Sequence, residues 1–156
     1  MLKVASYDIV FQEIPGEVTL ALNLSGCPCH CPGCHSPHLW QDTGEPLDVE
    51  LLDALIARYN GLITCVCFMG GDQAPEEVAR LAAHIQGLKT AWYSGRNRDL
   101  TDPTVLNDLK DFDYVKFGPY IEALGGLKSP TTNQRLYKRV GENWEDITFS
   151  FWKKTL

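Results

Sequence analysis

Four of the six cysteines lie within eight residues, where their spacing is suited to metal chemistry. Cys27, Cys31 and Cys34 are separated by three and then two residues, and Cys29 lies between the first two. A strand is predicted over residues 19–24 and a Ser-Gly turn follows it, so the thiols lie on a tight loop at the C-terminal end of a strand. An iron–sulfur cubane suits such closely spaced thiolates. Three cysteine ligands on a four-iron cluster leave one iron open to a small molecule.

Two other uses of cysteine are compatible with the composition. A zinc site could combine Cys31 and Cys34 with Cys65 and Cys67, because paired cysteines are common zinc ligands. An even number of cysteines also permits disulfides, but six in 156 residues is not disulfide-dense. We favour the cluster, because a three-then-two spacing matches two separated zinc pairs poorly. We expect Cys29 to be a thiol that does not bind the cluster.

Motifs spread over most of the chain resemble a known family. The cysteine spacing is the signature of the radical S-adenosylmethionine (radical SAM) superfamily. More narrowly, the chain resembles the activating proteins of the anaerobic, glycyl-radical ribonucleoside-triphosphate reductase. The segments that carry this narrower likeness are Gly26-Cys27 through Gly33-Cys34-His35, Gly70-Gly71-Asp72, Phe117-Gly118-Pro119-Tyr120 and Asn133-Gln134-Arg135.

The resemblance implies two cofactors, a 4Fe-4S cluster on Cys27, Cys31 and Cys34 and S-adenosyl-L-methionine. Gly70-Gly71-Asp72 matches the Gly-Gly-Glu-like element that holds the methionine amino group in the family, with the shorter Asp in place of Glu. Ser94 lies in a region that the family uses for ribose and carboxylate contacts, with Arg96 as a weaker match. His35 could stack on the adenine or contact the surroundings of the cluster. The resemblance implies no catalytic residue beyond the cofactors.

From the residues alone, these motifs also have structural explanations. Two glycines let a ligand approach the backbone at Gly70-Gly71-Asp72, and the acid can accept hydrogen bonds from an ammonium group, but an ordinary strand-to-helix turn fits as well. Arg96 could be a solvated loop charge and His35 a neutral loop histidine. The resemblance implies that Asn133-Gln134-Arg135 contacts the partner or closes over the site, whereas the residues alone also fit an exposed loop.

Cys65 and Cys67 are two residues apart on a predicted strand, so their side chains face the same side of it. Free cysteines are often buried. We therefore expect both to be core thiols. Gly118-Pro119 ends a later predicted strand, where it could shape the adenine end of a site or form a turn.

The implied activity is that of an enzyme, a radical SAM oxidoreductase that activates a glycyl-radical enzyme. It would generate a 5′-deoxyadenosyl radical that forms a glycyl radical on the anaerobic ribonucleoside-triphosphate reductase, with a flavodoxin-like protein as electron donor. One alternative is an activator of another glycyl-radical enzyme, of the formate-lyase type. The other is a non-catalytic module that binds a metal or transfers electrons.

The hydrophobic pattern predicts an α/β fold in one domain, residues 1–156. Strands alternate with helices, which indicates a mainly parallel sheet. A complete eight-unit barrel typically needs about 250 residues, so this chain is expected to form a partial (β/α) barrel, as the radical SAM resemblance also implies. An incomplete barrel leaves a side open to a loop of a large protein substrate. The predicted strands are 4–11, 19–24, 63–69, 90–93 and 114–117, the helices 47–59, 75–85 and 104–109, and a terminal hairpin 136–147.

Composition excludes several classes of function. The net charge of −6 argues against a nucleic-acid surface. No apolar run approaches the roughly 18 residues that a membrane span needs. The first 17 residues mix charged and apolar side chains, unlike a signal peptide. We expect a cytoplasmic protein with reduced thiols.

Overall fold

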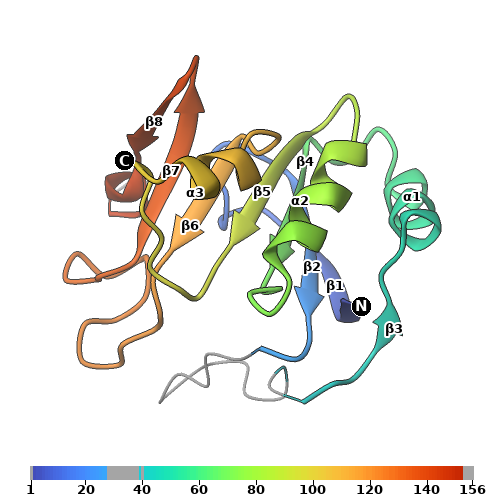
Figure 1. Ribbon diagram of the computed structural model, residues 1–156, viewed down its shortest axis with the longest axis horizontal. Coiled ribbons are helices and arrows are strands. Elements are labelled where there is room, and N and C mark those ends of the chain that lie inside the picture. The colour runs from blue at the N-terminus through green and yellow to red at the C-terminus, as the bar shows by residue number, and fades with distance from the viewer. Residues whose placement is uncertain (1, 28–38, 40, 153–156) are drawn as a thin grey trace.

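The computed structural model describes residues 2–27, 39 and 41–152, which form an α/β fold around an eight-stranded sheet (Figure 1). The strand order is β3-β1-β2-β4-β5-β6-β7-β8. The strands are β1 (Lys3–Val10), β2 (Thr19–Leu24), β3 (Glu45–Pro46), β4 (Cys65–Met69), β5 (Lys89–Tyr93), β6 (Tyr114–Phe117), β7 (Arg135–Val140) and β8 (Asn143–Asp146). The helices are α1 (Val49–Arg58), α2 (Pro75–His84), α3 (Pro103–Asp108) and a final 3-10 turn, η2 (Thr148–Phe151).

The sheet is mixed. Its four central strands, β2, β4, β5 and β6, are parallel, whereas every pairing on either side of them is antiparallel. The prediction of a mainly parallel sheet therefore holds only at the centre. Parallel neighbours need a crossover, and α1, α2 and α3 supply one between each central pair. The loop of residues 11–18 instead joins β1 to β2, and a two-residue turn joins β7 to β8. The sequence pattern does not predict the two-residue edge strand β3.

Each of the three α-helices begins and ends within two residues of its predicted bounds. Asp48 caps α1 by accepting a hydrogen bond from the Leu51 amide at 2.8 Å. Pro75 occupies the first turn of α2, where a missing amide hydrogen costs nothing. Asp102 caps α3 through the Thr104 amide. These local signals are readable from sequence because they depend on neighbouring residues only.

The two faces of the sheet bury different side chains. On one face, residues such as Leu22, Phe68 and Trp92 form the larger core beneath the helices, which cover that face in Figure 1. On the other face, a smaller core contains Ile14, Cys65, Cys67, Ala91, Tyr114 and Leu136. Loops and η2 cover this second core, through side chains that include Leu127 and Phe151. We call it the loop-covered face.

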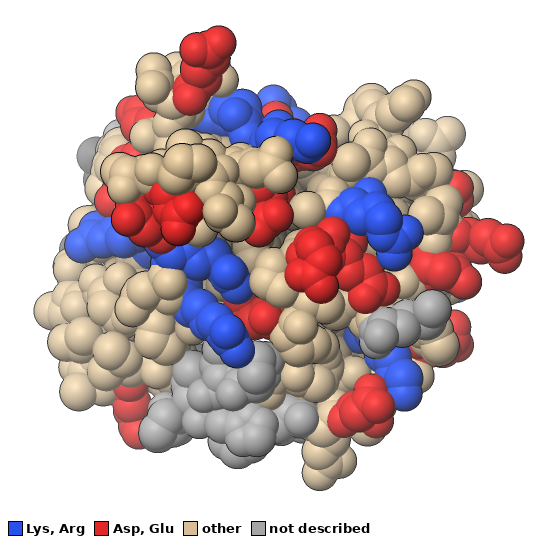
Figure 2. Space-filling model, viewed as in Figure 1, with Lys and Arg blue, Asp and Glu red and all other residues tan. Residues whose placement is uncertain are grey.

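The surface of the described residues carries charges of both signs. Acidic and basic side chains are interspersed across the face seen in Figure 2. Within the ranges that the structure describes, no helix has the length and apolar character needed to cross a membrane.

Candidate functional site

The C-terminal ends of the four parallel strands meet at one edge of the sheet, as the sequence predicts. Backbone hydrogen bonds continue across this edge, from Gly70 N to Tyr93 O at 3.0 Å and from Ser94 N to Lys116 O at 2.8 Å. The edge therefore brings together segments that lie far apart in the sequence. These segments are Ser25 to Cys27 after β2, Gly70 to Asp72 after β4, Ser94 to Arg96 after β5, and Gly118-Pro119 after β6.

The base of the cysteine loop is held at this edge. The Cys27 amide donates to Leu39 O at 2.9 Å, and the Gly26 amide donates to Gln41 O at 3.1 Å, so the two ends of the loop lie side by side. Cys27 is partly exposed and its thiol is free. The other cysteines of the predicted cluster site, Cys31 and Cys34, lie outside the described residues, as do Cys29 and His35.

Ser25 ties this loop base to its neighbours. Its hydroxyl donates to Thr43 O at 2.5 Å, and its carbonyl accepts a hydrogen bond from Gln73 Nε2 at 3.0 Å. Gln73 directly follows the Gly70-Gly71-Asp72 segment, so the loop base contacts the end of β4. The structure thereby places the base of the loop that carries Cys27 beside the segment that the resemblance assigns to the methionine amino group.

The backbone conformation favours glycine at both Gly70 and Gly71, and packing excludes a side chain at Gly71. Their φ angles are +105° and +85°, a backbone conformation that residues with a Cβ rarely adopt. A Cβ on Gly71 would lie 2.6 Å from Val78 Cγ2, inside the helix-covered core, and one on Gly70 would lie 3.3 Å from Leu24 O. The structural explanation for the glycine pair is therefore sufficient, whether or not a ligand also approaches its backbone.

Asp72 is buried, with 1% of its side chain exposed. Its Oδ1 accepts hydrogen bonds from Ser94 Oγ at 2.5 Å and from Arg98 Nη2 at 2.8 Å, and its Oδ2 accepts one from the Gly95 amide at 2.9 Å. Asp72 and Ser94, both predicted to bind cofactor, are thus brought into direct contact with each other. Arg96 contributes a backbone amide, which donates to Ser94 Oγ at 3.2 Å.

Arg98 belongs to this site although sequence reasoning missed it. Its guanidinium bonds both Asp72 and Ser94, and it lies over the Trp92 ring at 4.6 Å from the centroid. Buried carboxylates are usually paired with a basic side chain, and this is the one rule that could have indicated an arginine near Asp72. That rule could not choose between Arg96 and Arg98, because the choice depends on how the loop turns after β5.

Cys65 and Cys67 are buried in the loop-covered face, which confirms the prediction of core thiols. Burial raises the pKa of the Cys65 thiol to about 12 and that of Cys67 well above its usual value. Metal ligation needs the thiolate, so apolar burial makes this pair a poor half of a zinc site.

Tyr93 and Lys116 are paired in register at the edge of the loop-covered face. Burial raises the pKa of Tyr93 well above its usual value, and its hydroxyl donates to Glu13 O. The buried ammonium of Lys116 donates to Ser94 O at 3.1 Å and to Gly118 O at 3.0 Å. The sequence analysis did not select Lys116 as a site residue, because it is a single charge within an apolar strand. In the structure it places a positive charge beneath the strand ends.

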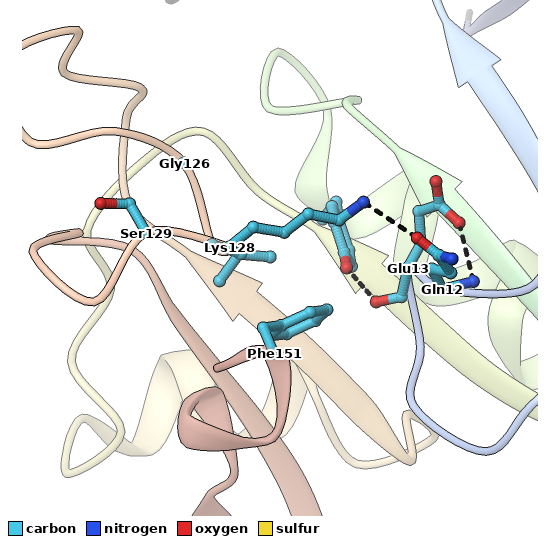
Figure 3. A pocket seen from close by; sticks show the side chains of 8 residues that line it. Gln12, Glu13, Gly126, Lys128, Ser129 and Phe151 are labelled. Carbon is cyan, nitrogen blue, oxygen red and sulfur yellow. Dashed lines mark hydrogen bonds between the residues drawn. The ribbon is translucent and has the colours of Figure 1, made fainter. Parts of the chain in front are cut away.

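A pocket of about 540 Å³ opens beside Tyr93 on the loop-covered face (Figure 3). In Figure 3 the Lys128 side chain extends toward Gln12, which it bonds at 3.0 Å, and Phe151 projects toward the same space. The remaining lining residues are Glu13, Gly126, Leu127 and Ser129. The pocket combines aromatic walls with polar groups at its rim, and its volume is in the range of ligand sites.

The segment Asn133-Gln134-Arg135 packs against the end of β6. Asn133 Nδ2 donates to Pro119 O at 3.1 Å, and Gln134 Nε2 reaches Gly118 O at 3.4 Å. A Cβ on Gly118 would lie 3.2 Å from Gln134 Cα. Gly118 is therefore a site of close backbone approach, and the segment borders the strand-end edge instead of projecting away from it.

The thiol of Cys27 at the edge, together with the cysteine spacing in the sequence, fits an iron–sulfur cluster. Cys27 supplies a free, partly exposed sulfur at the end of β2, and the other two cysteines of the triplet follow it within the next seven residues. A family model described as a 4Fe-4S single cluster domain matches residues 15–124, more than half of the chain, including all six cysteines. Among curated proteins and among solved structures, the comparisons found no match.

Proposed function

The chain belongs to the 4Fe-4S single cluster domain family, and we propose that it is a radical SAM enzyme that activates the anaerobic ribonucleoside-triphosphate reductase. One observation carries the proposal. The cysteine triplet begins at Cys27, three residues after β2 ends, and hydrogen bonds hold the base of its loop against Gln73, which follows Gly70-Gly71-Asp72. A cluster with an open iron would then lie beside the strand end suited to an amino-acid ligand.

In this proposal Cys27, Cys31 and Cys34 hold the cluster, and the other strand ends hold S-adenosylmethionine. Asp72 and Ser94 lie at neighbouring strand ends, and the Lys116 ammonium beneath them favours a carboxylate electrostatically. His35 remains a candidate for the adenine. The residues bind and orient the cofactor, which is the usual contribution of a protein to cofactor chemistry.

When bound, the cluster would supply one electron for reductive cleavage of S-adenosylmethionine to methionine and a 5′-deoxyadenosyl radical. This radical would take a hydrogen atom from a glycine and leave a glycyl radical and 5′-deoxyadenosine. The electron comes from a low-potential, flavodoxin-like protein. Reduced thiols and such a donor are consistent with the cytoplasmic location that the composition predicts.

The loop-covered face supports a protein substrate. Its pocket beside Tyr93 is lined mainly by loop residues, together with Phe151 of η2, and an extended peptide segment could approach the strand ends from this side. A glycine on a large subunit must reach the reacting carbon at near contact distance, which requires such an opening. A partial (β/α) barrel would provide it.

The proposal is tested by mixing the reduced, cluster-loaded protein with S-adenosylmethionine and the reductase of its own organism under anaerobic conditions. The expected result is a stable glycyl radical on the reductase, seen by electron paramagnetic resonance, with nucleotide reduction that depends on it. Cys31→Ala should produce no radical, and Cys29→Ala is the matched control. A radical only on a formate-lyase-type enzyme would identify a different partner, and reversible cluster reduction without any radical would indicate an electron-transfer module.

A further inference from the structure

An ion pair between Asp72 and Arg98 links the ends of β4 and β5. The Asp72 side chain is 1% exposed and the Arg98 side chain 16% exposed, so the pair is largely shielded from water. Oδ1 of the carboxylate is bonded by both Arg98 and Ser94, and Oδ2 is bonded by the Gly95 amide. The carboxylate is therefore engaged by the β5 end at both oxygens.

A second contact of Arg98 closes a ring of interactions. The guanidinium stacks 4.6 Å from the centroid of the Trp92 ring, and Trp92 Nε1 donates to Gly70 O at 2.7 Å. Arg98 thus holds the Gly70 to Asp72 segment twice, through the acid and through the indole. We call the group formed by Gly70, Asp72, Trp92, Ser94 and Arg98 the strand-end clamp.

The charges of the clamp disfavour direct binding of an ammonium group by Asp72. The carboxylate is already neutralised by a guanidinium 2.8 Å away, and a second cation at the same oxygens would be repelled by that guanidinium. A ligand ammonium would also have to displace the shielded Arg98 guanidinium, which bonds Asp72 Oδ1 through Nη2 and is held in place by a second bond from Nε to Ser94 Oγ. Asp72 is better placed to fix its own loop than to contact a ligand.

We propose that Arg98 is a positioning residue for S-adenosylmethionine, and that Asp72 acts on the cofactor through Arg98 instead of contacting its amino group. This inference rests on the proposed function. The clamp sets the spacing between the Gly70-Gly71 backbone and the Ser94 loop, the two strand ends to which the cofactor would bind. Loss of either charge releases both ends together, so the two charges act as one unit.

A double-mutant cycle tests the proposal on the cluster-loaded protein. The variants are Asp72→Asn, Arg98→Met and the double variant, with Arg98→Lys as the conservative change and Arg80→Met as the matched control. Arg80 lies on α2, 64% exposed, with only a 3.8 Å contact to Glu77. Anaerobic equilibrium dialysis gives the affinity for S-adenosylmethionine, and the change that the cofactor causes in the paramagnetic resonance of the reduced cluster reports its binding to iron. Iron, sulfide and melting temperature are measured on every variant.

Each single variant should bind S-adenosylmethionine about tenfold more weakly, and the double variant no more than about tenfold more weakly, because residues of one network are not additive. Arg98→Lys should bind S-adenosylmethionine more tightly than Arg98→Met but more weakly than the wild type, since lysine keeps the positive charge but lacks the planar guanidinium that bonds two partners and stacks over Trp92. Arg80→Met should match the wild type. Cluster content should be preserved in all variants.

Three results would overturn the proposal. If Arg98→Met binds as tightly as the wild type while Asp72→Asn does not, Asp72 contacts the cofactor directly. If the two losses multiply to about a hundredfold, the residues act independently. If only the melting temperature falls, the clamp is purely structural. A wild-type protein that holds its cluster but never binds S-adenosylmethionine would instead overturn the proposed function, and this inference with it.

Discussion

Replacing Gly71 with Ala tests whether the glycine pair after β4 is demanded by packing. Gly71 has φ +85°, and an added Cβ would lie 2.6 Å from Val78 Cγ2, 3.1 Å from Leu24 Cδ1 and 3.6 Å from Leu2 Cδ2. All three neighbours are buried in the helix-covered core. Gly87 offers a matched control, because its φ is +77° and nothing lies within 4 Å of the position of its Cβ.

The expected cost has two parts. The left-handed backbone costs an alanine roughly 1–2 kcal/mol at either position. At Gly71 the overpacked core adds about 1–3 kcal/mol, which Gly87 is spared. For a chain of this length, each kcal/mol lowers the melting temperature by about 2–4 °C. Gly71→Ala should therefore melt about 2–12 °C below Gly87→Ala.

Thermal unfolding of both variants, loaded with the cluster and kept anaerobic, measures this difference. Val78→Ala provides a further check, because removing Cγ2 should relieve most of the clash and make the double variant more stable than additivity predicts. If Gly71→Ala melts together with Gly87→Ala, the packing argument is wrong and a role in ligand approach becomes the better explanation for Gly71.

Three further predictions concern the cysteines and the partner. Replacing Cys27, Cys31 or Cys34 with Ala should abolish cluster binding, whereas Cys29→Ala, Cys65→Ala and Cys67→Ala should keep most of the iron and sulfide. The ligand assignment would be refuted if the Cys29→Ala protein lacked the cluster while the Cys31→Ala protein kept it. Because burial raises the pKa of Cys65 from near 9 to about 12, the folded state keeps its thiol proton when the unfolded state loses it, so the free energy of unfolding should fall as pH rises from 9 toward 12. Urea unfolding at a series of pH values measures this decline, which should be less steep in Cys65→Ala. An unchanged slope of the free energy of unfolding against pH would count against the burial argument. Asn133→Ala and Arg135→Ala should lower the glycyl-radical yield on the partner more than they lower the release of 5′-deoxyadenosine without the partner. Equal losses in both measurements would show that this segment does not dock the partner.

The central fold could be predicted from sequence because its signals are local. Alternating and helical hydrophobic periods located the central strands and the three α-helices. The antiparallel pairing of the outer strands was harder to predict from sequence. Pairing direction depends on the length and path of a connection, and the two residues of β3 are too few to show a period.

The strand-end edge was predicted for a related reason, since parallel strands must end together. Its internal contacts were not. Whether Asp72 faces a ligand or a guanidinium depends on the path of the loop that carries Arg98, and a buried lysine such as Lys116 has no sequence signature. The roles of Gly70 and Gly71 were open for the same reason, because only tertiary packing shows what a Cβ would meet.

The most direct test of the radical SAM assignment is cofactor cleavage by the protein alone. The cluster-loaded chain, reduced anaerobically by a strong chemical reductant, should convert S-adenosylmethionine to 5′-deoxyadenosine and methionine in equal amounts, as chromatography with mass detection would show. Cys31→Ala should form neither product, and Cys29→Ala should form both. A protein whose cluster is intact and reducible, yet which releases no 5′-deoxyadenosine, would contradict the assignment and leave an electron carrier.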